Sequence, residues 1–237
     1  MISVVACTYR KDFLDNIIFN FRKQTIKEKE LILVLNSSSF TLDQDILTGI
    51  KAKILQFSDE TTLGECLNKG VEAASYDVIA KMDDDDYYGP GYLQESYDAL
   101  KKTGADMVGK SSFYIFFKKL YELRLYNPAY ANCWITEHDH GQKIHFLCGA
   151  SLVFNKEIFK RISFPSVNLG EDTFFQKLCA EHHLKVYSLS NESYVYIRYD
   201  TSQHHTSDVR DSILRRRSKF VANTYSIADF MEKRERK

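Results

Sequence analysis

Short apolar runs alternate with amphipathic segments over the first hundred residues, and this order limits the fold more than any other feature of the chain. The apolar runs have the length of strands and lie at residues 2–7, 31–35, 52–57 and 77–81. Segments with helical periodicity follow them, at residues 12–24, 41–50, 62–74 and 92–102. Strands and helices that alternate in this way usually form a largely parallel sheet with helices on both faces. The sequence therefore predicts a mixed, mainly parallel α/β fold.

The second half of the chain has a different pattern. Residues 107–117 and 119–126 are rich in tyrosine and phenylalanine and predict antiparallel strands, and residues 137–142 predict a polar hairpin loop. We expect a helix over residues 171–183, strands over 186–189 and 194–199, and a charged helix from residue 207 onward. No linker interrupts the sequence. We therefore expect one domain over residues 1–206 and a C-terminal helical tail over residues 207–237.

The charges and cysteines limit the class of protein. The chain has 32 basic and 32 acidic residues, whereas nucleic-acid-binding domains are usually basic, so we expect no nucleic-acid partner. No apolar run reaches the roughly 18 residues that would span a bilayer. The five cysteines are dispersed and odd in number, which is typical of free thiols in a reducing compartment. We expect a soluble, cytoplasmic protein.

Four consecutive aspartates, Asp83–Asp86, end the fourth predicted strand. Sites in parallel sheets lie at the carboxyl ends of strands, so we expect Thr8–Arg10 and Asn36 in the same region. Adjacent carboxylates repel one another, and a hard divalent cation held by one or two carboxylates and substrate phosphates would relieve that repulsion. In an extended segment, the side chains of Asp83 and Asp85 would point to the same side. An acidic surface turn is the alternative interpretation.

Glu171 and Asp172 begin a predicted helix. Acidic residues are common in a first helical turn because they interact favourably with the helix dipole. A carboxylate in this position can also act as a general base that takes the proton of an attacking hydroxyl. These two residues alone leave both interpretations open.

Taken in order, these segments resemble the family 2 glycosyltransferases. Residues 2–10 (ISVVACTYR) resemble the opening strand of the family with its Thr-Tyr turn, Asp83–Asp86 with Pro90 resemble its Asp-x-Asp metal motif, and residues 170–175 (GEDTFF) resemble its Glu-Asp motif. Further matching segments are residues 24–25 (QT), 30–34 (ELILV), 63–64 (LG), 68–70 (NKG) and 149–154 (GASLVF). The resemblance covers about residues 2–200. It implies a GT-A fold with a nucleotide-sugar half, about residues 1–110, and an acceptor half, about residues 111–206.

The resemblance also implies a function, an enzyme that moves a sugar from a nucleotide diphosphate-sugar to an acceptor hydroxyl in glycan biosynthesis. Mn²⁺ or Mg²⁺ would bridge the two phosphates, with Asp85 as the preferred direct ligand and Asp83 beside it. Asp172 would be the general base of an inverting transfer, with Glu171 as the alternate. The residues that would bind the nucleotide are Thr8, Tyr9, Arg10, Asn36, Leu63, Asn68, Asp83 and Asp84.

The resemblance extends to the late part of the chain. His204 and His205 follow the last predicted strand, where many GT-A enzymes carry a histidine that closes over the diphosphate or metal; exposed surface histidines are the alternative. Trp134 and Tyr126 are candidates for the acceptor-binding wall, because sugar rings stack on aromatic faces. After Arg210 the tail has an excess of basic residues. We expect a solvated terminal helix there, with peripheral membrane contact or oligomerisation as the alternative.

Asn36 is a departure from the family pattern, because many members have Asp at this position. An ionised Asp only accepts hydrogen bonds, whereas Asn both donates and accepts them, so uracil, cytosine and other bases stay open. A non-catalytic binding or assembly protein with the same fold is an alternative function, although the intact aspartate run argues against it. A sugar nucleotidyltransferase is a further alternative, but it would carry a glycine-rich loop after the first strand, and residues 7–10 contain no glycine.

Overall fold

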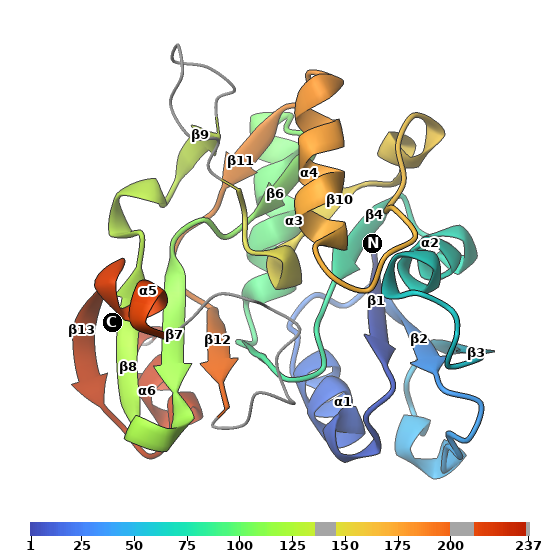
Figure 1. Ribbon diagram of the computed structural model, residues 1–237, viewed down its shortest axis with the longest axis horizontal. Coiled ribbons are helices and arrows are strands. Elements are labelled where there is room, and N and C mark those ends of the chain that lie inside the picture. Colours follow the sequence, from blue (N-terminus) through green and yellow to red (C-terminus); the bar gives the residue numbers. More distant parts are fainter. Residues whose placement is uncertain (136–145, 200–210, 236–237) are drawn as a thin grey trace.

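The computed structural model describes residues 1–135, 146–199 and 211–235, which form two sheets and the helices around them (Figure 1). The first sheet contains β1 (Ile2–Thr8), β2 (Lys29–Asn36), β3 (Ala52–Phe57), β4 (Val78–Lys81), β6 (Met107–Gly109), β9 (Cys133–Ile135), β10 (Val153–Asn155) and β11 (Val186–Ser188). The second contains β5 (Tyr87–Tyr88), β7 (Phe113–Phe117), β8 (Glu122–Tyr126), β12 (Tyr194–Arg198) and β13 (Ser218–Asn223). The helices are α1 (Leu14–Arg22), α2 (Leu63–Ala73), α3 (Tyr92–Thr103), α4 (Glu171–Glu181), α5 (Asp211–Arg216) and α6 (Ile227–Glu235).

The first sheet has the strand order β3-β2-β1-β4-β10-β6-β11-β9. Strands β3, β2, β1 and β4 are parallel, and β10 runs antiparallel between β4 and β6. The chain moves outward from β1 to β2 and β3 and then returns to β4 on the other side of β1. The strand order therefore reverses between β1 and β4, and ligands of open α/β sheets bind outside the carboxyl ends at such a reversal. The predicted mixed, mainly parallel α/β fold is confirmed.

Helices cover both faces of the first sheet. On one face, α1 and α3 bury Ile17, Phe21 and Leu93 in a core that contains Val4 of β1. On the other face, α2 and α4 bury residues such as Leu67 and Phe175 against Val5. Close packing of α2 depends on Gly70, since a Cβ atom there would lie 2.4 Å from Cγ1 of Val5. A sheet held on both faces gives the loops at its carboxyl edge fixed positions.

The second sheet begins beside the aspartate run, because β5 follows Asp86 directly. Its order is β13-β8-β7-β12-β5, with β12 parallel to β7 and the other pairs antiparallel. Met231 of α6 packs on one face of this sheet, against Tyr114 and Leu123. Phe113 and Tyr194 on the opposite face belong to the main core. The second sheet is therefore anchored to the first through buried aromatic residues.

Three predicted elements differ from the structure. Residues 41–50 contain only a short 3₁₀ turn, Gln44–Leu47, because the Asp43 side chain accepts the Asp45 N–H at 3.1 Å and competes with helical bonding. Residues 107–117 split into β6 and β7, which belong to different sheets. The tail predicted as one helix contains strand β13, which pairs with β8.

The tail prediction was wrong because tertiary pairing overrode the charged pattern. Ser218 of β13 accepts a hydrogen bond from Nε of Arg124 on β8, at 2.9 Å, and backbone pairing continues to Asn223. The predicted hairpin loop at residues 137–142 lies outside the described residues. None of the described helices is long and apolar enough to cross a membrane.

Candidate active site

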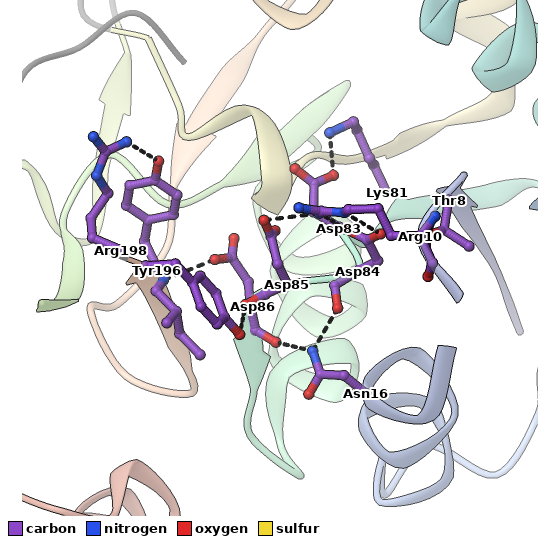
Figure 2. Close-up of polar contacts among 12 residues, drawn as sticks. Thr8, Arg10, Asn16, Lys81, Asp83, Asp84, Asp85, Asp86, Tyr196 and Arg198 are labelled. Carbon is purple, nitrogen blue, oxygen red and sulfur yellow. Dashed lines mark hydrogen bonds and ion pairs between the residues drawn. The ribbon is translucent and has the colours of Figure 1, made fainter. Parts of the chain in front are cut away.

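The chain bends after β4, and each of the first three aspartates faces a cation or hydroxyl from a neighbouring strand end (Figure 2). Asp83 forms an ion pair with the buried ammonium group of Lys81. Asp84 accepts the Thr8 hydroxyl at 2.6 Å and Nε of Arg10 at 3.1 Å. Nη2 of Arg10 also lies 2.9 Å from Oδ2 of Asp85. The carboxyl ends of β1 and β4 therefore build one charged cluster.

Asp86 faces the second sheet. Its carboxylate accepts the Tyr194 hydroxyl at 2.6 Å and the Ile197 N–H at 2.9 Å. The amide groups of Asn16 and Asn20, one turn apart on α1, donate to backbone carbonyl oxygens of the aspartate run. These bonds hold a bend at Asp84–Asp86, so the aspartate run is not the extended segment that the sequence predicted. Asp85 shares Arg10 with Asp84, while Asp83 pairs with Lys81.

The cluster has more negative than positive charge. Among the described residues, Arg10 forms ion pairs with Asp84 and Asp85, and Lys81 forms an ion pair with Asp83. The pKa of Asp85 is raised because the side chain is buried and lies near Asp84 and Asp83, although Arg10 opposes the shift. A divalent cation would supply the missing positive charge, and oxygen ligands such as the Asp83 and Asp85 carboxylates suit Mg²⁺ or Mn²⁺.

The described residues contain no group of three or more potential metal ligands. A site in which one or two carboxylates hold the ion together with substrate phosphates does not require such a group. Asp83 and Asp85 therefore fit a metal of this kind.

Lys81 connects the aspartate run with the start of α4. Burial lowers the pKa of its ammonium group, but Asp83, Glu171 and Asp172 together raise it well above its usual value. Burial raises the pKa of Glu171 to about 7, with Lys81 opposing the shift and Asp172 and Asp83 adding to it. Acidic groups that are almost ninety positions apart in sequence therefore surround one buried ammonium group.

Asp172 lies against the turn Gly149–Ser151. A Cβ atom at Gly149 would be 1.5 Å from Oδ2 of Asp172, so only glycine leaves room for this carboxylate. The next residue, Ala150, accepts the Tyr88 hydroxyl at 2.6 Å, and the oxygen of that hydroxyl accepts the Asp83 N–H at 2.8 Å. This turn therefore lies between Asp172 and the aspartate run. Oδ1 of Asp172 accepts the Thr173 N–H at 2.6 Å, whereas no donor of the described residues is bonded to Oδ2.

Asn36 ends β2 at the same edge of the sheet. Its Nδ2 donates to the Thr61 carbonyl oxygen at 2.9 Å, and its Oδ1 is buried and has no hydrogen-bond partner among the described residues. The carbonyl oxygen of the amide can therefore accept a hydrogen bond from a ligand, as an Asp oxygen would. Two other residues of the predicted nucleotide set differ in exposure. Tyr9 is 56 % exposed, whereas Leu63 is half-buried at the start of α2.

Asn68, a member of the predicted nucleotide set, is bonded to the backbone of a loop residue, Phe164. Its Nδ2 donates to the Phe164 carbonyl oxygen at 2.8 Å, and its Oδ1 accepts the Phe164 N–H at 2.9 Å. Both ends of the amide therefore hold the backbone of Phe164, so Asn68 has a structural role whether or not it also contacts a nucleotide. The motif resemblance placed Asn68 on the correct helix but could not show which way its side chain turned.

The predicted acceptor residues lie away from the aspartate run. Trp134 is on the edge strand β9, is 45 % exposed, and its ring centroid lies 5.3 Å from that of Tyr187. Tyr126 ends β8 and packs on Phe113, whose ring lies 5.8 Å from Tyr194, the partner of Asp86. Tyr126 is therefore connected to the site through two aromatic rings. His204 and His205 lie outside the described residues.

Several residues of the site were missed in the sequence, namely Asn16, Asn20, Lys81, Tyr88 and Tyr194. Three of them had a visible signal. Asn16 and Asn20 are polar residues four apart on a helix whose other inward positions are apolar. Lys81 interrupts an apolar strand two residues before Asp83, and residues at this spacing share a side of a strand.

Three comparisons bear on this geometry. The model of glycosyl transferase family 2 matches residues 3–163. The chain is 22 % identical to the glucosyl-dolichyl phosphate glucuronosyltransferase of Haloferax volcanii, over 88 % of this chain and 70 % of that protein. S. aureus TarS (residues 1–349, with UDP-GlcNAc) superposes with a TM-score of 0.68 at 17 % identity, over 88 % of this chain and 61 % of that one.

A mannosyltransferase from Pyrobaculum calidifontis, in complex with GDP-Man and Mn²⁺, superposes with a TM-score of 0.58 at 12 % identity, over 86 % of this chain and 58 % of that one. At these identities the two structures show the fold alone, and they confirm the GT-A prediction. The chain spans about three fifths of the length of the TarS fragment.

Proposed function

Because this chain belongs to glycosyl transferase family 2, we propose that it transfers a sugar from a nucleoside diphosphate sugar to an acceptor hydroxyl with inversion at the sugar carbon. The observation that carries the proposal is that the two acidic motifs lie on either side of the turn Gly149–Ser151, which contacts Asp172 at Gly149 and is bonded through Tyr88 to Asp83. Such a site has one acidic group beside the leaving diphosphate and another beside the attacking hydroxyl, and inverting transfer needs both.

The donor would bind over the carboxyl ends of β1, β2 and β4. Oδ1 of Asn36 would accept an N–H of the base, and Arg10 and Thr8 would line the diphosphate side. Asp83 and Asp85 would hold Mn²⁺ or Mg²⁺, which supplies positive charge for the departing phosphate oxygens. The likeness to proteins solved with UDP-GlcNAc and with GDP-Man and Mn²⁺ supports this assignment.

Asp172 would act as the general base. Its Oδ2 takes the proton of the acceptor hydroxyl while that oxygen bonds to the anomeric carbon, and the bond from this carbon to the diphosphate oxygen breaks. The nucleoside diphosphate leaves with the electron pair, and no covalent enzyme intermediate forms. Glu171 is the alternate base. Lys81 balances the charge of Glu171, Asp172 and Asp83 before the proton is transferred.

The acceptor would approach from the side of α4 and the second sheet. Tyr126 and Trp134 are the proposed stacking surfaces, and a saccharide is the acceptor class that suits them. A role in glycan biosynthesis belongs to the same proposal, since the Haloferax volcanii relative is by its name a glucosyl-dolichyl phosphate glucuronosyltransferase. A cytoplasmic location is also part of the proposal.

Calorimetry tests the donor site. UDP, CDP, GDP and dTDP are titrated with and without Mn²⁺ into the wild type and into Asp85→Ala. We expect one nucleotide to bind tightly in the presence of Mn²⁺ and to lose most of that affinity in the variant. If none of the four binds to the folded protein, the transferase proposal is wrong, and a non-catalytic assembly protein becomes the better account.

A further inference from the structure

Arg10 lies at the centre of the aspartate cluster, where a metal ion would also have to act. Its side chain is 17 % exposed, and those of Asp84 and Asp85 are 6 % and 14 % exposed. Two of its nitrogen atoms bond to Asp84, through Nε at 3.1 Å and through Nη2. Nη2 also reaches Oδ2 of Asp85 at 2.9 Å. Arg10 is therefore bidentate toward Asp84 and forms a single contact with Asp85 (Figure 2).

The surroundings of Arg10 fix the guanidinium group in this position. The Arg10 N–H donates to Oγ1 of Thr8 at 2.9 Å, and the same hydroxyl donates to Asp84 at 2.6 Å. The ring of Phe13 lies beneath the guanidinium carbon, with its centroid 4.3 Å away. The two bonds to Asp84, the backbone contact and the ring would all persist if the contact with Asp85 were broken. The contact between Nη2 of Arg10 and Asp85 is therefore the contact of Arg10 whose loss would disturb the guanidinium position least.

We propose that Nη2 of Arg10 and the divalent ion compete for Asp85, and that the ion takes over Asp85 when it binds while Arg10 stays on Asp84. The proposal rests on the metal-assisted function above. Once Asp85 is released, Nη2 can donate to a phosphate oxygen of the donor, a partner that suits a guanidinium fork. Metal and nucleoside diphosphate then strengthen each other's binding, because each favours the same exchanged arrangement.

The exchange predicts that Arg10 weakens binding of the metal alone. Mn²⁺ without nucleotide is titrated into the wild type, Arg10→Met, Lys11→Met and Asp85→Asn, and free Mn²⁺ is followed by electron paramagnetic resonance. We expect Arg10→Met to bind Mn²⁺ about tenfold more tightly, which corresponds to one charge-assisted hydrogen bond that no longer has to be broken.

Lys11→Met is the matched control for net charge. Lys11 is exposed, follows Arg10 directly and forms no described salt bridge, so its loss removes one positive charge without touching Asp85. We expect Lys11→Met to bind Mn²⁺ as the wild type does, and Asp85→Asn to lose the site.

Two results would overturn the exchange. One is that Arg10→Met binds Mn²⁺ no more tightly than the wild type, while binding still depends on Asp85. The metal site at Asp85 would then be supported, but the exchange with Arg10 would be refuted. The other is an equal increase of Mn²⁺ affinity in Arg10→Met and Lys11→Met, which would show that the lower net charge alone strengthens metal binding. Because Arg10→Met could fold poorly, a crystal structure of the wild type with Mn²⁺ provides a second measurement. It should show Nη2 beyond hydrogen-bonding distance of Asp85 and still bonded to Asp84, and an intact Asp85 contact would refute the proposal.

Discussion

At the scale of single residues, Gly149 determines where the Asp172 carboxylate can lie. A Cβ atom at position 149 would fall 1.5 Å from Oδ2 of Asp172. The same atom would fall 2.7 Å from Cβ of Asp172, which side-chain rotation cannot move, so Gly149→Ala should displace both the carboxylate and the start of α4 and should also lower stability. We expect turnover to fall by at least about a hundredfold, the lower range for loss of a positioned general base, while nucleotide affinity is retained.

A second glycine provides the control for this prediction. At Gly91, whose φ is −83°, the nearest atom to a Cβ would be Oγ of Ser193, at 3.6 Å, which is ordinary contact. Gly91→Ala should leave turnover within about twofold of the wild type. Activity of Gly149→Ala near that of Gly91→Ala would show that Asp172 need not occupy the position described.

For single residues, the sequence was most informative where a residue type is unusual at its position in a predicted element. Four aspartates after an apolar strand indicated a site, and the structure brings them together with Arg10 and Thr8 as expected. The orientation of side chains was not predictable in the same way. Asn68 turns toward the backbone of Phe164, and the donor group of Asn36 is used by Thr61. Both depend on loops distant in sequence, which no local pattern encodes.

At the scale of elements, Glu30 connects β1, β2 and the turn after α2. Its buried carboxylate accepts the Ser3 hydroxyl at 2.7 Å, the Ser75 N–H at 2.6 Å and the Ser75 hydroxyl at 3.0 Å. Burial raises the pKa of Glu30, but these hydrogen bonds outweigh it, and the net shift is downward. The group therefore stabilises the fold fully above its unfolded-state pKa, and this contribution is lost as pH falls through the lower folded-state pKa.

Glu30→Gln should accordingly reduce the free energy of unfolding by about 1–3 kcal/mol at pH 7, because an amide weakens or loses the hydrogen bonds that a carboxylate accepts. The difference from the wild type should shrink at acidic pH, as the pH falls through the lowered folded-state pKa of Glu30 and the group becomes protonated. Urea unfolding of the variant and the wild type, at pH 7 and at acidic pH, measures this difference in the free energy of unfolding. Glu72→Gln is the control, since that side chain is 61 % exposed. A difference that grows toward low pH would contradict the assignment.

Elements with strong periodicity were predicted well and short ones poorly. The residues expected in β3 are those observed, Ala52–Phe57, and α2 begins within one residue of its expected start because Thr62 and Glu65 form a capping box. Strand β13 was missed because the charged residues on either side of it, such as Arg215–Arg217, fit an exposed helix locally, and only pairing with β8 makes it a strand. The local sequence pattern therefore does not predict a strand whose formation depends on pairing with a partner strand.

At the scale of the whole molecule, the Tyr194 hydroxyl joins the second sheet to the aspartate run. It donates to Oδ2 of Asp86 at 2.6 Å inside the core, and Asp86 is 1 % exposed. Tyr194→Phe should lower the free energy of unfolding by about 1–3 kcal/mol, because it leaves a buried carboxylate without one of its donors. Urea unfolding measures the change. Tyr225→Phe, at a side chain that is 89 % exposed, should have no effect, and equal stability of both variants would refute the role of Tyr194.

The architecture as a whole was predictable only in part. The mainly parallel sheet, its GT-A character and the family membership follow from the order of the motifs, and the structure and the comparisons confirm them. The two sheets are interleaved along the chain, since β5 joins the second sheet and β9 to β11 join the first. Such long-range pairing has no local signature, so the division into a nucleotide-sugar half and an acceptor half at residue 110 stays a prediction.

The central claim is that the two acidic motifs form one active site in which Asp172 is the base. Release of nucleoside diphosphate from the nucleotide sugar selected by calorimetry, in the presence of a saccharide acceptor, tests it in the wild type and Asp172→Asn. We predict that turnover falls by about 10²–10⁴-fold, the usual contribution of a general base, while calorimetric affinity for the nucleotide and Mn²⁺ is unchanged. Turnover by Asp172→Asn at close to the wild-type rate, with the protein folded and the donor bound, would contradict the account.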